Sequence, residues 1–271
     1  MKNLLGINSN CINDQTPDFL ETETLKIIKD VGFNGFFTSK FTLKEAEELK
    51  LTADKLGLEF FSIHAPFKHI NTLWEKGEDY KIVLENLKTS VNTASILGVK
   101  TVVVHVSSTW RPPKISKIGL ERFKELAEFS KDKKVNLAFE NLRVKEYLDV
   151  VLKSLKDYKN VGFCYDFGHE SCFSAQKNLF LPLYGKMLLA THIHDNFGRT
   201  IIDDSIKDDL HYIPLDGDID YKPIIKGIKE LSSSVPLTLE VAKNAKKSYK
   251  ELSPKEFITL AFNRLKQIIN L

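Results

Sequence analysis

The sequence predicts one α/β domain folded as a (β/α)8 TIM barrel, and three observations support this prediction. Short runs rich in β-branched and aromatic residues alternate with longer amphipathic runs along the whole chain, the pattern of parallel strands joined by crossover helices. Eight such pairs are present, the number that closes a barrel. The 271 residues contain no Gly/Ser linker, so residues 1–271 are expected to form a single barrel domain.

The expected elements follow in order from the spacing of apolar residues. Short apolar or alternating runs predict strands at 4–8, 35–38, 59–64, 101–105, 136–140, 161–166, 188–194 and 237–240. Apolar residues at three- and four-residue spacing predict helices at 21–30, 43–55, 79–97, 119–131, 144–155, around 175–184, 221–231 and 254–269. The longest connections, at about 66–76, 107–116 and 197–220, all follow strands, on the side of a barrel where functional loops lie.

Composition and charge exclude several classes of protein. Hydrophobic residues make up 42% and charged residues 28% of the chain, as in soluble globular proteins, and no apolar run is long enough to span a membrane. The first residues lack the apolar segment of a secretory signal, and three sparse cysteines favour a reducing compartment. We therefore expect a cytoplasmic protein. A net charge of +3 argues against nucleic acid as a partner, whereas a homo-oligomer is compatible with the sequence.

The later strands share a pattern at their C-terminal ends, where a mostly small residue precedes a polar one by two positions. The six triplets are Ser62-Ile-His64, Val103-Val-His105, Ala138-Phe-Glu140, Cys164-Tyr-Asp166, Ala190-Thr-His192 and Thr238-Leu-Glu240. Period 2 places both residues of each pair on one face of the strand and bulkier neighbours on the other, against the helices. Those bulkier neighbours are Phe61, Phe139, Phe163 and Leu239. Six ionisable groups are therefore expected to point inward at the C-terminal rim, where the chemistry of this fold occurs.

The strand at 161–166 leads directly into an acid, a glycine and a histidine. Its alternation puts Cys164 and Asp166 on one face and two aromatic side chains on the other. Gly168, which has no side chain, would let the backbone turn just before His169. Taken alone, this stretch is better explained by a helix cap at Asp166 and a surface histidine. The repeated pattern at the other strand ends favours a site.

A metal ion would explain why so many carboxylates converge. Without one they would repel each other and shift toward protonation. Five of the seven histidines fall at or just beyond strand ends: His64, His105, His169, His192 and His211. His69 and His194 are left over, and because His192 and His194 share one strand face, periodicity leaves open which of them is the ligand. Asp209, two residues before His211, adds a further candidate, with a polar turn as the alternative.

The motifs resemble those of the xylose-isomerase-like barrel superfamily over strands three to eight. They read His64-Ala-Pro, Val104-His105, Phe139-Glu140-Asn141, Asp166-Phe-Gly-His169, His192-Ile-His-Asp195, Asp209-Leu-His211 and Leu239-Glu240. The resemblance implies a metal-dependent enzyme and leaves two branches open. One comprises sugar isomerases, epimerases and inosose-processing enzymes, and the other comprises apurinic endonucleases of the endonuclease IV type.

Resemblance to the epimerase branch implies one divalent metal ion with four ligands: Glu140, Asp166, His192 and Glu240. Three carboxylates and an imidazole suit Mn²⁺ or Mg²⁺, with Co²⁺ as a further candidate. The implied reaction acts on an α-hydroxyketone through an enediolate, with Glu140 and Glu240 exchanging protons as an acid/base pair. His169 would then lie near the substrate oxygens. The expected function is a sugar or polyol isomerase or epimerase, and its partner is a small sugar or polyol.

Resemblance to the endonuclease branch implies three zinc ions and phosphodiester hydrolysis at abasic DNA. The chain has a candidate for each of the nine ligands: His64, His105, Glu140, Asp166, His169, His192, Asp209, His211 and Glu240. The residues after His192 and the lack of a cysteine between Asp166 and His169 depart from that branch. The loop at 67–74 offers apolar residues that could wedge into a duplex.

A barrel that binds a sugar with a vestigial metal site is the third interpretation. The retention of both Glu140 and Glu240 argues against it, because a binding module needs no proton-transfer pair. No Gly-rich phosphate loop is present, and Arg199 is one weak candidate for binding an anion. A free and a phosphorylated sugar therefore both stay open as substrates.

Overall fold

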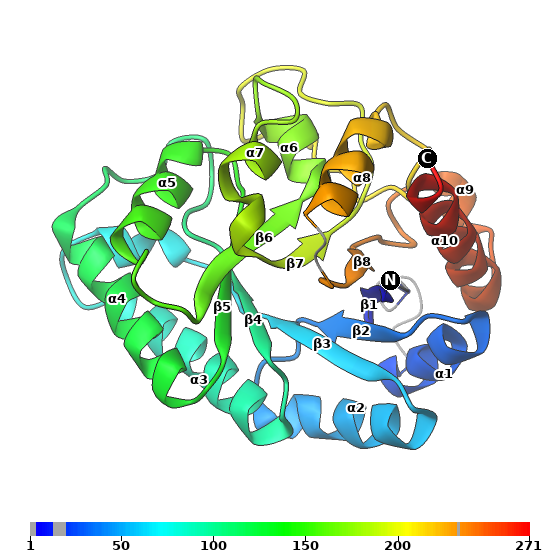
Figure 1. The fold of residues 1–271 in the computed structure, drawn as a ribbon, viewed down its shortest axis with the longest axis horizontal. Coiled ribbons are helices and arrows are strands. Elements are labelled where there is room, and N and C mark those ends of the chain that lie inside the picture. The colour runs from blue at the N-terminus through cyan, green and yellow to red at the C-terminus, as the bar shows by residue number, and fades with distance from the viewer. Residues whose placement is uncertain (1–3, 13–19, 232–233) are drawn as a thin grey trace.

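The computed structural model describes residues 4–12, 20–231 and 234–271, and its centre is one sheet of eight parallel strands (Figure 1). The strands are β1 (Leu5–Asn8), β2 (Gly35–Thr38), β3 (Glu59–His64), β4 (Thr101–Val104), β5 (Asn136–Glu140), β6 (Val161–Asp166), β7 (Leu188–His192) and β8 (Leu237–Leu239). Their order is β7-β6-β5-β4-β3-β2-β1-β8. Ile193, just after β7, pairs with Leu239 in parallel and closes the barrel. The predicted (β/α)8 TIM barrel is confirmed.

Helices surround the sheet, and their positions agree with the expected ranges to within about two residues in most cases. They are α1 (Glu21–Val31), α2 (Leu43–Leu56), α3 (Tyr80–Leu97), α4 (Lys117–Asp132), α5 (Lys145–Ser154), α6 (Phe167–Phe173), α7 (Phe180–Tyr184), α8 (Tyr221–Glu230), α9 (Lys247–Lys250) and α10 (Pro254–Ile269), with 3₁₀ helices η1 (Ile70–Trp74) and η2 (Gly185–Met187). Among the described residues, no helix is both long and apolar enough to cross a membrane.

The helix expected around 175–184 is wrong in extent, because α7 covers only Phe180–Tyr184 and a second short helix, α6, precedes this range at Phe167–Phe173. Asp166 ends β6 and accepts a hydrogen bond from the backbone N–H of His169, so α6 begins at once. The buried carboxylate of Glu170 accepts the N–H groups of Leu179 and Phe180 and thereby caps α7.

Three strands end earlier than expected. β4, β7 and β8 end before His105, His194 and Glu240, respectively, so these side chains project from the first residues of loops. Single hydrogen bonds continue the pairing there: the N–H of Ile193 donates to the carbonyl of Thr238 at 2.9 Å, and the N–H of Glu240 donates to that of Ile193 at 2.9 Å. These bonds fix the loop starts at the rim.

The predicted alternation of faces is confirmed for most strands. Small residues fill the barrel interior: Val103, Ala138, Cys164 and Ala190 form a cluster of their own. Phe139, Phe163 and Leu239 belong instead to the large outer core beneath the helices.

Phe61 was expected to face the helices, and this is wrong. The β2–β3 register shifts between Phe36 and Phe37, so one extra residue of β3 turns its side chain inward. The Phe61 ring lies against Gly6 and Gly35, where an added Cβ would come within 2.8 Å of it. The β-bulge therefore fills the lower part of the barrel with an aromatic ring.

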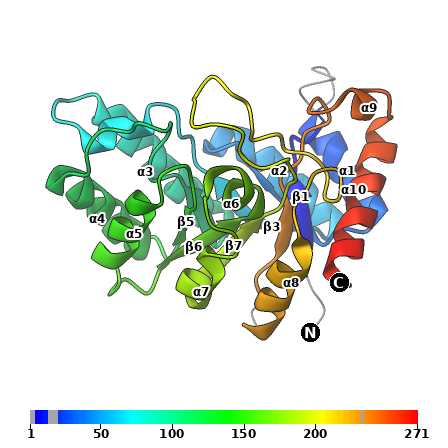
Figure 2. The same ribbon diagram turned by 90° about the horizontal axis from the view of Figure 1, so that it is seen from above.

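The two ends of the barrel differ in chemistry. A cavity of about 350 Å³ at the N-terminal end is lined by Phe61, Ser62, Thr238 and other residues near the strand starts, and its described lining includes Asp54 and Glu59 but no histidine. Figure 2 shows the β7–α8 connection (yellow) and the β3–α3 connection (cyan) rising on the opposite side from the N-terminus. The predicted site residues lie on that loop-bearing side.

Candidate functional site

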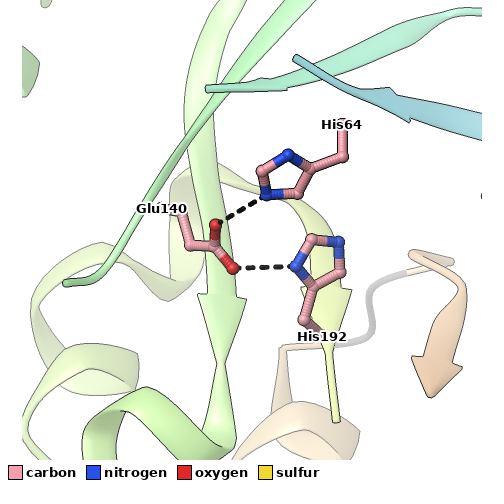
Figure 3. A group of neighbouring side chains, drawn as sticks. All are labelled: His64, Glu140 and His192. Atoms are coloured by element: carbon pink, nitrogen blue, oxygen red, sulfur yellow. Dashed lines mark hydrogen bonds and ion pairs between the residues drawn. The ribbon is translucent and has the colours of Figure 1, made fainter. Parts of the chain in front are cut away.

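Glu140, the last residue of β5, is the centre of the site. Its side chain is fully buried, and both oxygens are surrounded by imidazoles from other strands (Figure 3). Oε2 lies 3.4 Å from Nε2 of His64 and 2.9 Å from Nε2 of His105, while Oε1 lies 2.7 Å from Nδ1 of His192. Three histidines, two from the ends of β3 and β7 and one from the residue after β4, therefore share one carboxylate.

Four side chains at the ends of successive strands lie close enough together to hold one cation. Glu140, Asp166, His192 and Glu240 each offer one ligand atom, and these atoms all lie within 4.8 Å of one another. Oε2 of Glu240 lies 3.3 Å from the same Nδ1 of His192 that contacts Glu140. These are the four residues that the resemblance to the epimerase branch implied as one metal-binding set.

A second group lies beside the first and includes the loop residues before α8. His169 Nε2 lies 3.3 Å from Asp209 Oδ2, and His211 Nε2 lies 3.3 Å from Asp209 Oδ1. His194 Nε2 lies 3.2 Å from Asp166 and 3.4 Å from Asp209. All nine residues predicted from the sequence therefore converge at one rim.

The structure distinguishes His192 from His194, which periodicity could not do. Both point into the barrel and are fully buried. His192 contacts Glu140 and Glu240, whereas His194 contacts Asp166 and Asp209 and stacks on His211 with ring centroids 4.2 Å apart. His192 therefore belongs to the four-residue group, and His194 joins the second group as a tenth residue.

Burial and neighbouring charges have opposite effects on the pKa values of these groups. Burial alone would raise the pKa of Glu140, but the neighbouring His192 and the close imidazoles of His105 and His64 hold that pKa well below its usual range. Burial would lower the pKa of His169, but Asp166 and Asp209 raise it to about 10. The carboxylates around His169 thus favour its protonated imidazole.

Several buried atoms of the cluster have no hydrogen-bond partner in the described part of the chain. They are Glu140 Oε2, Asp166 Oδ2, Asp209 Oδ1, His192 Nε2 and both ring nitrogens of His194. Buried polar atoms without partners are costly and rare. Carboxylate oxygens and imidazole nitrogens are the donors that bind divalent cations, so the residues present fit a metal site.

Asn141 orients the end of β6, a role that the sequence did not indicate. Its side-chain amide donates to the carbonyl of Asp166 at 2.8 Å and accepts the N–H of Asp166 at 2.8 Å. Its own carbonyl lies 3.0 Å from Nδ1 of His169. One residue after Glu140 thus fixes both Asp166 and His169. Its place in the Phe-Glu-Asn motif was the available signal.

Two further residues hold imidazoles in place. Phe37, from β2, stacks on His192 with ring centroids 4.5 Å apart. Gly168 was expected to permit a turn, and this is wrong: it lies inside α6. A Cβ at Gly168 would lie 1.9 Å from Cε1 of His194. The glycine is required because the His194 ring packs directly on it.

Asp195 organises the loop that brings Asp209 and His211 to the site. Its carboxylate accepts the N–H groups of Leu215, Ile219 and Asn196 at 2.8 to 3.2 Å. Its backbone pairs with Tyr212, next to His211. The loop is therefore anchored on the C-terminal side of the segment from Asp209 to His211, and this segment is part of the site.

The mouth of the site is enclosed by aromatic rings. Phe67 stacks over His105 with centroids 4.3 Å apart, and Phe173 stacks on His169 with centroids 5.0 Å apart. The expectation that the loop at 67–74 offers a DNA wedge is largely wrong. Ile70, Leu73 and Trp74 are buried in η1, because Trp74 donates to the carbonyl of Val106 and packs on the core. Phe67 is the exposed apolar residue of this loop.

Comparisons with known proteins agree with the barrel. The family model described as xylose isomerase-like TIM barrel matches residues 25–255. The uncharacterized protein y4fM of Sinorhizobium fredii (strain NBRC 101917 / NGR234) is 32% identical over 169 residues, which are 58% of this chain and 52% of that protein. The chain thus spans about half the length of the curated relative it matches.

Solved structures resemble the whole chain at low identity. The IOLI protein, in a structure with a zinc atom, has a TM-score of 0.73 at 19% identity, covering 98% of each chain. The 3-keto-D-glucoside 4-epimerase YcjR from E. coli has a TM-score of 0.72 at 17% identity, covering 97% of this chain and 99% of its own. An L-ribulose 3-epimerase has a TM-score of 0.72 at 16% identity, covering 100% and 95%. At these identities, the likeness shows the fold.

Proposed function

The chain belongs to the xylose isomerase-like TIM barrel family, and from this premise we propose that it is a metal-dependent isomerase or epimerase of a sugar or polyol. One observation carries the proposal: the ligand atoms of Glu140, Asp166, His192 and Glu240 lie within 4.8 Å of one another, each at the end of a different strand. Structures of two sugar epimerases share the barrel. Their substrates indicate the class to be tested.

In the proposed reaction, Glu140 and Glu240 move protons at the carbon next to a substrate carbonyl. Both contact Nδ1 of His192, at 2.7 and 3.3 Å, so the two carboxylates lie close to each other in the same site. One would remove a proton to give an enediolate and the other would return one, which inverts or relocates a hydroxyl-bearing centre. A cation held by Glu140, Asp166, His192 and Glu240 would supply Lewis-acid polarisation of the carbonyl.

The other residues of the rim would bind and orient the substrate. His169 Nδ1 lies 3.8 Å from both Glu140 and Asp166, close enough for its ring to donate to a substrate hydroxyl beside the carboxylates. Phe67 and Phe173 cover His105 and His169 and would exclude water from the reacting carbon. An enclosed rim of this kind suits a small molecule.

Hydrolysis of abasic DNA by three zinc ions is the second candidate, and one observation favours it. Three further sets of ligand atoms lie within 4.8 Å of one another: His64, Glu140 and His192; Asp166, His169 and His194; and His194, Asp209 and His211. Five or six imidazoles suit zinc. The burial of the residues expected to wedge into DNA argues against this candidate, because the loop then offers Phe67 alone.

Metal analysis of protein purified without chelators separates the two candidates. About one Mn, Mg or Co per chain is expected for the isomerase, and three zinc ions per chain would overturn that assignment. An abasic-site DNA substrate supplies the second arm: nicking that a chelator removes would support the hydrolase. A ketose and inosose panel supplies the third, since a vestigial binding barrel would convert none of its members.

A further inference from the structure

Two arginines from different loops meet at one aromatic pair in the barrel mouth. The guanidinium carbon of Arg143, just after β5, lies 4.2 Å from the ring centroid of Phe173. That of Arg199, after β7, lies 5.3 Å from the ring centroid of Trp110, and its Nη1 donates to the carbonyl of Phe173 at 3.4 Å. The two rings pack edge to face with centroids 5.7 Å apart. Both cations therefore lie on the same aromatic platform.

This platform adjoins the candidate metal ligands. The ring of Phe173 stacks on His169 with centroids 5.0 Å apart, and His169 in turn contacts Asp209. Arg143 is thus separated from the acid–histidine cluster by a single aromatic ring.

One polar atom of the Arg143 guanidinium lacks a hydrogen-bond partner within the described ranges. This atom, Nε, is buried. The ion-pair contact of Arg143 to Asp204 Oδ1 is long, at 3.9 Å from Nε, and that oxygen also accepts the backbone N–H of Trp110 at 2.9 Å. Because a buried N–H without a partner is costly, an oxygen from a bound anion would stabilise this side chain.

We infer that Arg143 and Arg199 form an anion subsite that binds the phosphate or carboxylate group of an acidic sugar derivative. Guanidinium groups present planar sets of N–H donors that match the oxygens of both anions. The inference rests on the proposed function for the sugar part of the ligand. It narrows the substrate class to ketoses or polyols that carry a negative charge at the end remote from Glu140 and Glu240.

The test compares matched neutral and anionic ligands by isothermal titration calorimetry on the full chain loaded with Mn²⁺. The probes are glucitol, glucitol 6-phosphate and gluconate, with inorganic phosphate as a fourth. The variants are Arg143→Gln, Arg199→Gln and the matched control Arg111→Gln, which removes one exposed positive charge from the same side of the barrel. Far-UV circular dichroism checks that each variant is folded.

Glucitol 6-phosphate or gluconate is expected to bind at least about 10-fold more tightly than glucitol, equivalent to about 1.4 kcal/mol. The preference should disappear in Arg143→Gln and Arg199→Gln and persist in Arg111→Gln. Preference for the phosphate or for the carboxylate identifies the source of the anion. Equal affinity for neutral and anionic probes overturns the inference, as does a preference that survives both substitutions, because the anion would then sit on the histidine cluster.

The binding measurements do not depend on catalysis. Turnover of neutral ketoses together with equal binding of all probes would refute the anion subsite and leave the proposed function standing. Arginine-dependent anion binding without turnover of any ketose would support the anion subsite and refute the proposed function.

Discussion

Replacing Gly168 with alanine tests whether His194 is held by direct packing on α6. The added Cβ would lie 1.9 Å from Cε1 and 2.2 Å from Nδ1 of His194, whereas carbon atoms in contact are normally about 3.5 to 4.0 Å apart. Alanine at a helical position would by itself stabilise the helix by at most about 1 kcal/mol. An overpacked core costs up to about 3 kcal/mol. We therefore expect Gly168→Ala to destabilise the protein by about 2 kcal/mol.

Urea unfolding of the metal-free protein measures this change, with Gly227→Ala in α8 as the matched control. There an added Cβ would meet only the end of the Leu181 side chain, at 3.1 Å, so a small gain of up to about 1 kcal/mol is expected. Gly168→Ala should also weaken metal binding, because a displaced His194 ring leaves Asp166 and Asp209.

A double-mutant cycle with His194→Ala isolates the clash. Once the ring is absent, Gly168→Ala should cost nothing, so the two substitutions should be non-additive by about 2 kcal/mol. Additive effects, or a Gly168→Ala protein more stable than the parent, would refute the packing argument.

Three further predictions concern the rim. Asn141→Ala removes both side-chain hydrogen bonds to the backbone of Asp166 and should lower stability by about 1 to 3 kcal/mol and metal affinity with it, as measured by urea unfolding and metal titration; unchanged metal affinity would count against its orienting role. Burial lowers the pKa values of His169 and His211, but Asp209 and neighbouring carboxylates raise both from 6.5 to about 10. The stability they contribute is therefore complete below pH 6.5 and lost as pH rises through about 10; calorimetry should show the melting temperature of the metal-free protein falling over that interval, and a rise would contradict the sign. Glu240→Gln should reduce kcat by at least about 100-fold while the circular dichroism spectrum is unchanged; full turnover would exclude Glu240 as an acid or base.

Most of the fold followed from short-range patterns. Alternation with period 2 identified the inward-facing small residues, and three- and four-residue spacing identified the long helices, because both depend on which side chains leave water. The failure at Phe61 has a different cause. Its direction depends on a register shift against β2, and no pattern within β3 alone records how a neighbouring strand pairs with it.

The site was predictable for a related reason. Ends of parallel strands converge at one rim, so polar residues at strand ends such as Glu140 and Asp166 could be grouped before their distances were known. The supporting residues could not be grouped in this way. Phe37 belongs to no motif, and the Phe-Glu-Asn motif did not reveal what Asn141 contacts; their roles arise from a ring stack and from hydrogen bonds between strands. The apolar residues Ile70, Leu73 and Trp74 of the loop at 67–74 are buried, which the sequence did not indicate because apolar composition does not distinguish core packing from an exposed wedge.

Proton exchange at carbon is the event on which the proposed function depends. Incubating the metal-loaded protein with a panel of free and phosphorylated ketoses and inososes in D₂O, followed by NMR, measures it directly. We predict that deuterium enters the carbon next to the carbonyl of at least one substrate, and that Glu240→Gln abolishes this incorporation. No incorporation into any member of the panel, with the same preparation nicking abasic-site DNA, would contradict the proposed function.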